Sequence, residues 1–575
     1  MHGTLKRNRS RSGKAASAVP SLMDNTGLSE PAADGGPLTS RQVRLIFAGL
    51  MLGMLVAAIN LTTVAPALPR IVAELGGMEH YSWVALSASL TSAVVVPAVG
   101  KLGDLFGRKP FYVGGLLLLM LSSVLSGLSR TFWFLVGARV VQGVAMGMLV
   151  PLSQTIIGDI AAPRERGKYQ GLMGMAFGVA SVSGPPLGGW ITEQFSWRWI
   201  FFINLPVGLV ALWFILRYMH LPHRRRSARI DYTGFATLTL GLLAVLLATT
   251  WGGSEYPWSS APVLGLYGAG GLLLVLFGVS QRRSPEPVIP LYLWRNPIFA
   301  AASLGSMTLA MAMFGAIYFV PMFAQGVMGL GVASSGFVLI PLDIGIILVS
   351  AANGFLIAKT GYYKPQMLLG LPLVALGYMA LSRLGPGDTL AALLLRMVMI
   401  GAGIGSTMQT YTLVVQNSVP YRDMGVATGA VQFARNVGST VGVALMGTIL
   451  AASLRTELPR FLPPGVDAEL VLPAGGQGAG DVAALFDPAL LAALPLEAVD
   501  GIRAGLSVAY KPLFLAGLAF AALSLVATLF LKPVPLQTKA PHDRLENAEH
   551  EPGDDAAARA PARAGDAQMV MTRRP

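Results

Sequence analysis

Cysteine is absent from this 575-residue chain, and charged residues are scarce. The missing thiols exclude disulfides, thiolate metal sites and cysteine catalysis. Only 12% of the residues are charged and 53% are hydrophobic, whereas soluble proteins carry roughly 25% charged residues. The chain also lacks a Walker-type phosphate loop, so it does not hydrolyse ATP through that motif. This composition predicts an all-α polytopic membrane protein.

Histidine is rare as well. The six histidines lie outside the apolar segments, and His220 and His223, three positions apart, fall in a basic loop where we expect them to be solvated. A membrane enzyme would need a cluster of His, Asp or Glu at a membrane face, so we expect no enzyme, no metal site and no cofactor. The net charge of +13 comes without a nucleic-acid-binding module, so we expect no nucleic-acid partner. A sensor would need a soluble signalling domain, which neither tail supplies.

Fourteen apolar stretches are long enough to cross a bilayer, which needs about 20 residues. They lie at 45–69, 81–100, 111–129, 132–157, 169–192, 199–219, 232–251, 261–281, 298–323, 333–358, 366–384, 388–416, 425–452 and 511–533. We expect disordered tails at 1–42 and 534–575 and an extracytoplasmic loop at 453–510. Within that loop, residues 489–506 favour an amphipathic helix on the bilayer surface. Contact of the loop with a periplasmic adaptor, a lipoprotein or lipid stays open.

Lysine and arginine are divided unevenly between the loops on the two sides. With both tails and 453–510 left out, seventeen lie on one side, and only Arg70, Arg130, Arg198 and Arg383 lie on the other. Cations collect on the cytoplasmic side of membrane proteins. The even helix count then predicts two cytoplasmic termini, in a multi-pass protein of a bacterial cytoplasmic membrane surrounded by lipid.

Two parts of the chain resemble one another at a constant spacing. Arg139 precedes Arg396 by 257 positions, and Pro163 precedes Pro420 by the same number. Parallel repeats build some transporters from two related bundles, although chance similarity between glycine-rich helices is the alternative. The repeat predicts an N-terminal six-helix bundle at 43–219, a linker with two inserted helices at 220–297 and a C-terminal six-helix bundle at 298–533.

Several motifs now point to one family. GKLGDLFGRK at 100–109 resembles the loop signature of the major facilitator superfamily, and GVASVSGPPLGGWI at 178–191 resembles its antiporter signature in the fifth helix. SWRWIFFINLPVG at 196–208, DYTGF at 231–235 and VATGAVQFARNVGSTVG at 426–442 are similar to its fourteen-helix drug:proton antiporter branch, the EmrB/QacA-like multidrug exporters. The resemblance implies the major facilitator fold and proton-coupled export of drug-like amphipathic compounds by alternating access. Export of a lipid, a siderophore or a self-made antibiotic stays open, as does uptake.

We interpret 100–109 as a conformational latch that stabilises the outward-facing state. Glycines permit a tight turn and close helix approach, and Asp104 can pair with Arg108 or with backbone amides of a neighbouring helix. Simple anchoring by cations is the alternative, but it does not explain Asp104. The repeat has Ala358 where Asp104 would fall, so we expect no equivalent latch in the second half. The latch residues are Gly100, Gly103, Asp104, Gly107, Arg108 and Lys109.

The fifth apolar stretch combines small residues with two prolines. Small residues let helices approach closely, and prolines interrupt the hydrogen-bond ladder. We expect a close, bent contact between the two bundles there, with generic helix packing as the alternative. The residues are Gly178, Gly184, Pro185, Pro186, Gly188 and Gly189.

Charged side chains at bilayer depth usually mark ion or substrate pathways. Asp343 lies near the middle of the tenth stretch, and we predict that it is the protonatable coupling residue, with Arg435 or Arg139 as a modulator. A structural ion pair is the alternative. Family members often carry an acid in the first helix, in a pattern resembling LDxTIVxxALP, where this chain has Asn60 in INLTTVAPALP. Asn60 cannot carry a proton, so coupling is either supplied by Asp343 or altered.

Polar and adaptable apolar side chains on the predicted helices suggest a substrate cavity. Flexible apolar walls with few fixed polar groups suit varied amphipathic substrates, although helix–helix packing explains any single residue equally. The candidates are Asn60, Thr62, Gln142, Gln154, Met311, Phe314, Asn353, Gln409, Tyr411 and Gln432.

Overall fold

The computed structural model describes residues 39–77, 80, 83–219, 230–252, 256–462, 496–533 and 536. The elements of this part of the chain are helical, apart from one isolated bridge between Gly252 and Tyr256. The helices are α1 (Ser40–Leu75), α2 (Trp83–Phe106), α3 (Arg108–Gly127), α4 (Phe132–Ile160), α5 (Pro163–Gln194), α6 (Trp199–Phe202), α7 (Asn204–Tyr218), α8 (Tyr232–Trp251), α9 (Ala261–Arg283), α10 (Pro297–Gly326), α11 (Val332–Gly336), α12 (Ile340–Thr360), α13 (Lys364–Leu381), α14 (Leu390–Ser418), α15 (Met424–Glu457) and α19 (Leu496–Leu529). Short 3₁₀ turns are η2 (Leu291–Arg295), η3 (Phe337–Leu339), η4 (Tyr421–Asp423) and η5 (Leu458–Arg460).

The predicted all-α membrane fold with fourteen crossings is confirmed. Thirteen helical segments among the described residues are long and apolar enough to span a bilayer. The remaining crossing is α5, which has 32 residues but is diluted by glycine, serine and proline. Two crossings are built from consecutive pieces, α6 with α7 and α11 through η3 to α12. The orientation of the termini stays a prediction.

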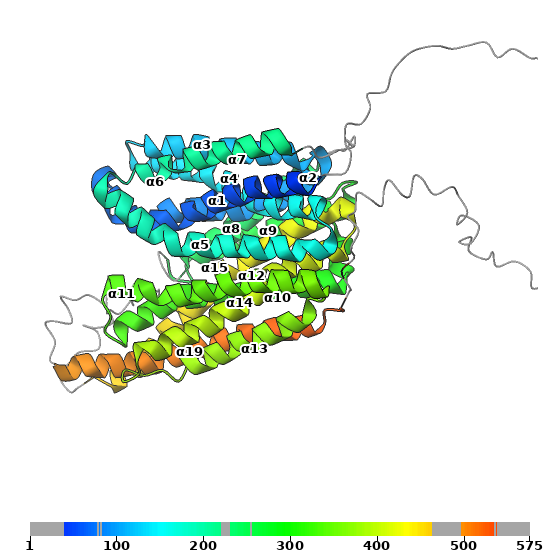
Figure 1. Ribbon diagram of the computed structural model, residues 1–575. Helices are drawn as coiled ribbons and strands as arrows, with labels where there is room; N and C mark the ends of the chain where they lie inside the picture. Colours follow the sequence, from blue (N-terminus) through cyan, green and yellow to red (C-terminus); the bar gives the residue numbers. More distant parts are fainter. Residues whose placement is uncertain are drawn as a thin grey trace, which may run out of the picture. The chain divides into compact units, whose positions relative to one another are not determined.

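The helices form two groups, which we call the first half (α1–α7) and the second half (α10–α19), and Figure 1 shows α5 of the first half beside α12 of the second. Each half has its own apolar core. The largest core runs from Leu293 to Leu536 and lies in the second half with its flanking turns, while two smaller cores lie within residues 43–219.

The internal repeat is visible in α4 and α14, which both have 29 residues. Thr131 caps the N-terminus of α4, and Thr389 caps α14 in the same way, 258 positions later. Gly143 faces the backbone of α2 at Ala88, just as Gly401 faces the backbone of α12 at Leu342. A spacing of 258 therefore aligns the helices, and the predicted match of Arg139 with Arg396 is out of register by one residue. Met397 occupies the position equivalent to Arg139.

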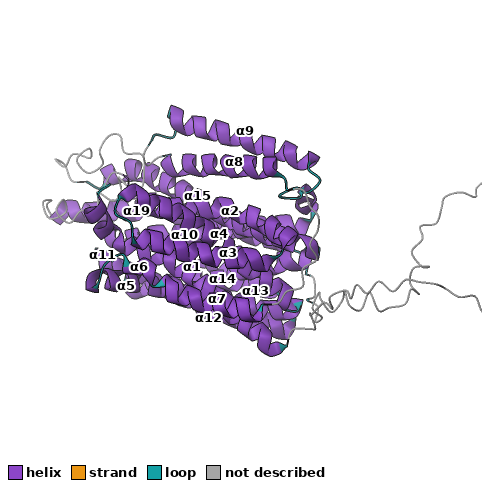
Figure 2. Ribbon diagram, turned by 90° about the horizontal axis from the view of Figure 1, so that it is seen from above, coloured by secondary structure: helices purple, strands orange, loops and turns teal. Residues whose placement is uncertain are grey.

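The inserted helices α8 and α9 lie to one side of the two halves, with α9 outermost (Figure 2). Leu238, Leu242 and Leu246 of α8 share an apolar core with Leu90 of α2 and Phe433 of α15, so α8 touches both halves. Large apolar side chains of α9 are exposed, among them Leu272 at 62% and Val275 at 64%. Such a surface suits contact with lipid.

The cap of α8 ties the insertion together. Asp231 accepts hydrogen bonds from the Gly234 backbone (2.8 Å) and from Gln281 of α9 (2.9 Å). Burial alone would raise the pKa of Asp231, but these hydrogen bonds and one from Thr233 outweigh it and lower the pKa. The hydrogen bonds to the carboxylate thus fix the α8–α9 hairpin.

Three predicted boundaries need correction. Helix α1 begins at Ser40, inside the predicted tail, because Thr39 and Gln42 form a capping box. The loop predicted at 453–510 is shorter on both sides, since α15 runs to Glu457 and α19 starts at Leu496. Residues 496–506 are helical, as this part of the predicted surface helix requires, and they continue directly into the last crossing. The tails up to residue 38 and beyond 536, and residues 463–495, lie outside the described residues.

Candidate functional site

Helices α2 and α3 meet in a tight turn that brings Asp104 and Arg108 together. Gly107 joins them with φ 91°, a conformation that strongly favours glycine. Arg108 therefore lies four residues after Asp104, and its Nη2 donates to Asp104 Oδ1 at 2.8 Å. We call this end of the helices, which also carries Lys101, Arg164 and Lys359, the basic end.

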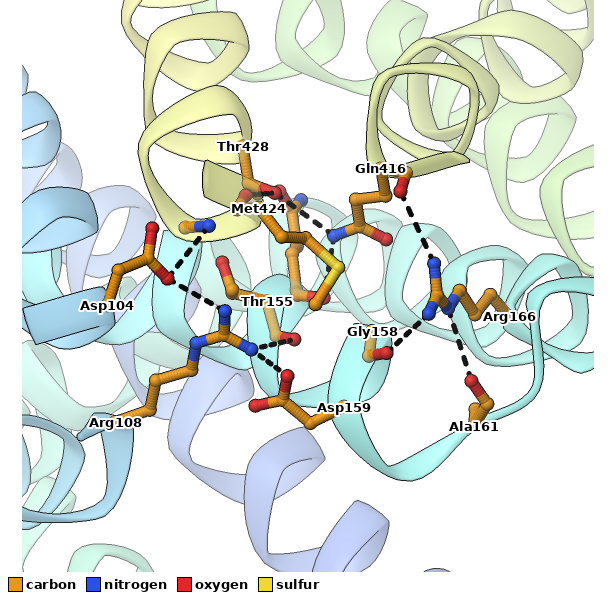
Figure 3. A network of polar contacts seen from close by, with 12 residues as sticks. Asp104, Arg108, Thr155, Gly158, Asp159, Ala161, Arg166, Gln416, Met424 and Thr428 are labelled. Atoms are coloured by element: carbon orange, nitrogen blue, oxygen red, sulfur yellow. Dashed lines mark hydrogen bonds and ion pairs between the residues drawn. The ribbon is translucent and has the colours of Figure 1, made fainter. Parts of the chain in front are cut away.

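The Asp104 carboxylate crosses to the second half, as Figure 3 shows. It accepts hydrogen bonds from the backbone N–H groups of Gly425 (3.0 Å) and Val426 (2.9 Å) in the first turn of α15. The first N–H groups of a helix have no intrahelical partner and carry partial positive charge, so a carboxylate binds there favourably. The contact predicted from the sequence is therefore present.

Three partners of Arg108 were missed by the sequence analysis. Arg108 also pairs with Asp159 near the end of α4, and it donates to the Thr155 carbonyl at 3.2 Å. Its guanidinium lies 5.7 Å from the centre of the Tyr421 ring in the second half. Asp159 lies in the last turn of α4, just beyond the predicted apolar stretch 132–157, and no periodicity in the sequence relates it to residues 100–109.

The glycines of the turn permit close packing against both halves. A side-chain carbon on Gly100 would lie 2.6 Å from the Gly425 carbonyl oxygen, so a larger residue does not fit there. Gly103 packs more loosely against Leu152 of α4. Lys109 is not part of the contact between halves, because its Nζ donates to the Leu216 carbonyl (3.5 Å) at the end of α7.

Buried Lys101 ties the same turn to the insertion. Its Nζ lies 2.6 Å from Glu286, in the segment that follows α9. The same segment is held to α9 itself by Gln281, which accepts from the Ile289 backbone at 3.1 Å. The basic end of α2 is thus linked to the second half directly and to the insertion by an ion pair.

A second contact between the halves runs along α5 and α12. Gly171 of α5 approaches Gly354 and the Ser350 carbonyl, and Gly178 approaches Ile347. Toward the other end of α5, however, Gly184 and Gly188 lie nearest to Thr62 and Thr63 of α1, within the first half, and Gly189 has no neighbour within 4 Å. The predicted contact between bundles is therefore wrong for Gly184 and Gly188 and lies nearer the basic end. Helix α5 continues through Pro185 and Pro186.

Amide side chains line the seam between the halves. Gln154 Nε2 of α4 donates to Gln409 Oε1 of α14 at 3.2 Å. Asn353 of α12 donates to the Ser406 carbonyl (2.7 Å) and to Thr410. These residues adjoin a cavity of about 10 Å³ that Asn353, Gln409 and Thr410 help to line, which has room for about one water molecule.

The ten predicted cavity residues do not share one cavity within the described part of the chain. Tyr411 is buried in the second half, where its hydroxyl meets Ser524 and Thr528. Met311 and Phe314 pack in or against the same half's interior. Thr62 donates to the Ala180 carbonyl of α5 within the first half. Most of these side chains pair with neighbouring helices because a buried polar group needs a partner.

Arg139 is buried in the first half without a carboxylate partner among the described residues. Its Nη1 donates to Asn60 Oδ1 (2.8 Å) and Gln142 Oε1 (2.6 Å), and its Nε donates to the Val84 carbonyl. Asn60 thus occupies the place where an acid would form an ion pair with Arg139. The amide nitrogen of Asn60 is buried without a partner.

The second half also has a buried cation, Arg435 of α15. It donates to Gln432 (3.1 Å) and to the Met408 carbonyl (2.9 Å). In the described part of the structure, neither Arg435 nor Arg139 pairs with Asp343. The expected arginine modulator of Asp343 is therefore not present in this conformation.

Asp343 lies on the face of α12 that packs against α5. Its backbone carbonyl lies 3.5 Å from the position that a Gly178 side chain would occupy, one turn before Ile347 on the same face of α12. The side chain is partly buried and has no hydrogen bond or ion pair among the described residues.

Comparison with known proteins identifies the family. A sequence profile of the Major Facilitator Superfamily matches residues 50–443. The chain belongs to this superfamily. It is a multi-pass transporter of the cell membrane and not an enzyme.

Curated relatives and solved structures agree with this assignment. The chain is 34% identical to the Multidrug transporter protein MdtP of Bacillus subtilis over 519 residues, 87% of this chain and 95% of that protein. It is 31% identical to Multidrug resistance protein 3 of the same organism, over 86% of this chain and 96% of that one. The human organic anion transporter MFSD10 shares the fold, with a TM-score of 0.55 and 15% identity over 85% of this chain and 99% of that one.

Proposed function

We propose that this transporter exports drug-like amphipathic compounds across the cell membrane in exchange for protons, by alternating access. The observation that carries the proposal is the closure at the basic end, where Asp104 of the first half binds the N-terminus of α15 in the second. Because the cation bias assigns this end to the cytoplasm, the described conformation is closed toward the cytoplasm. The names of the two Bacillus relatives support multidrug export as the cargo class.

Asp343 is the residue that we propose for proton coupling. It lies on the α12 face that packs against α5. Its protonation therefore changes a charge beside a contact between the halves that must open and close. Each proton that enters releases about 2.3 kcal/mol per 100 mV of membrane potential, and this free energy is the proposed source for export.

Purified protein in liposomes with an imposed pH gradient tests both parts of the proposal. We expect a panel of fluorescent cations to include at least one, such as ethidium, whose movement follows the gradient. Asp343→Asn should abolish the gradient dependence, and Asp343→Glu should retain it. Asp388→Asn, at an exposed carboxylate in the loop before α14, is the matched control. Gradient-driven transport in Asp343→Asn would reject Asp343, and no transport of any compound in the panel by the unchanged protein would reject multidrug export.

Altered coupling is the second candidate, and the Asn60–Arg139 contact favours it. A neutral amide stands against Arg139, so the first half has no titratable partner for this cation in the described structure. Under this alternative, transport continues without a pH gradient. Asn60→Asp would then introduce a gradient dependence that the unchanged protein lacks.

A further inference from the structure

Helix α12 ends at the basic end against a cation of the first half. Arg164, in the first turn of α5, donates from Nε to the Ala358 carbonyl at 2.7 Å and from Nη2 to the Lys359 carbonyl. The last four carbonyls of a helix have no intrahelical partner and carry partial negative charge. A guanidinium with several donors in a fixed fork is well suited to bind two of them at once.

This junction corresponds by the internal repeat to the one made by Asp104. In the first junction the C-terminal end of α2 meets the N-terminus of α15, and in the second the C-terminal end of α12 meets the N-terminus of α5. Ala358 lies at the repeat position of Asp104, 254 residues later. In the second junction the Ala358 backbone carbonyl thus takes the place of the Asp104 carboxylate. The charged side chain is the positive Arg164 of α5, the helix on the other side of the junction.

Arg166, two residues later, adds a second cation to the seam, as Figure 3 shows. It donates to the Gly158 (2.6 Å) and Ala161 (3.1 Å) carbonyls at the end of α4. It also reaches the Gln416 carbonyl (3.5 Å) and the Asn417 side chain (3.4 Å) at the end of α14. One buried guanidinium therefore binds the C-terminal ends of two repeat-related helices, one from each half.

We propose that Arg164 forms a second latch at the basic end, opposite in charge to that of Asp104, and that Arg166 supports it. The second half still has no acid at the position of Asp104, because Ala358 stands there, and in this proposal the first half supplies the charge instead. Both latches take their charged side chain from the first half and their binding groups from helix ends of the second. Opening the basic end must break both. The inference rests on the alternating access proposed above, and its test measures opening rather than transport.

The absence of cysteine makes a single reporter thiol possible. Ser350→Cys is nearly isosteric, and Ser350 is buried in the α5–α12 seam with its Oγ 3.1 Å from the Gly171 carbonyl oxygen. A membrane-impermeant maleimide, added at the basic end in inverted vesicles, reaches this thiol only when the seam opens. The labelling rate therefore reports the fraction of open molecules.

Arg164→Gln in this background should raise the labelling rate about tenfold, the loss expected for a charge-assisted hydrogen bond. Arg164→Lys should restore part of the protection. Arg283→Gln, at an exposed cation ending α9, should leave the rate unchanged. Arg164→Met keeps the aliphatic stem without its donors and gives the same readout if the Gln variant does not fold.

An unchanged rate in Arg164→Gln and Arg164→Met, while Asp104→Asn accelerates labelling, would overturn the second latch alone. An unchanged rate in all of these variants would instead contradict the proposed alternating access. The two failures are therefore distinguishable.

Discussion

Replacing Asp104 with asparagine should open the basic end. The variant keeps one carbonyl oxygen but loses the charge, and its new NH₂ group faces one of the two N–H groups, that of Gly425 or that of Val426. The Asp104 side chain is only 5% exposed, so water does not weaken the lost interaction. The pair with Arg108 lies within the first half, so the contacts of the Asp104 carboxylate that cross between the halves are the two backbone contacts.

The magnitude follows from these two contacts. A hydrogen bond to a charged group contributes about 1.5–3 kcal/mol, and the asparagine oxygen retains part of one. We therefore expect the closed state to lose about 2 kcal/mol, which corresponds to a roughly thirtyfold shift toward the open state.

Spin labels at two introduced cysteines measure this shift directly. Arg44 of the first half and Tyr362 of the second are exposed near the basic end, and the distance distribution between them should gain a longer component in Asp104→Asn. Glu74→Gln is the matched control, because Glu74 pairs with Arg198 within the first half, at the other end. A distribution identical to that of the unchanged protein would refute the latch.

Three further outcomes are expected. Gly100→Ala should prop the basic end open in the same spin-label assay, because its new carbon would meet a backbone oxygen, while Gly189→Ala should have no effect, because that position faces open space. Asp231→Ala removes the cap of α8 and should cost about 1 kcal/mol of stability, seen as a lower melting temperature in detergent. Because the pKa of Asp231 is lowered on folding, the stabilisation that its carboxylate contributes is complete above the unfolded-state pKa and is lost as the pH falls through the folded-state pKa. Equal melting temperatures of the unchanged protein and Asp231→Ala at neutral pH would contradict this role. Tyr411→Phe leaves Ser524 and Thr528 without their shared partner and should cost about 1 kcal/mol, with export unchanged; a loss of export at unchanged stability would point to a direct role in transport.

Much of the fold follows from the sequence because crossing a bilayer demands long apolar helices. The positions of these helices along the chain can be recognised from hydropathy alone. The Asp104 contact was predictable as well, since an acid among cations and glycines at a helix end needs a specific partner. Arg164 and Asp159 were not predictable in the same way. Arg164 binds two backbone carbonyls, which any residue type could supply. Asp159 pairs with Arg108, some fifty positions away, and no pattern in the sequence links the two.

The glycines of α5 show where sequence reasoning loses precision. Gly171, Gly178 and Gly184 all allow close approach, and the sequence does not tell which neighbour approaches each of them. The structure divides them, with Gly171 and Gly178 on α12 and Gly184 on α1. The same limit explains why the predicted shared cavity was wrong. Hydropathy identifies Asn60 and Tyr411 as polar groups in apolar helices, but it does not show that each of them forms hydrogen bonds within its own half.

Helix α12 connects the proposed proton site with the second latch. Asp343 lies near its start and the Ala358 and Lys359 carbonyls lie at its end, about 24 Å apart at 1.5 Å per residue. Glycines of α5 and α14 pack against the helix between these points. If Asp343 is the proton site, as proposed above, a proton bound there acts on the same helix whose far end Arg164 holds. Coupling should then weaken when α12 is made flexible: a glycine introduced at exposed Leu348, between the two sites, should reduce gradient-driven transport while leaving the labelling rate of the closed state unchanged.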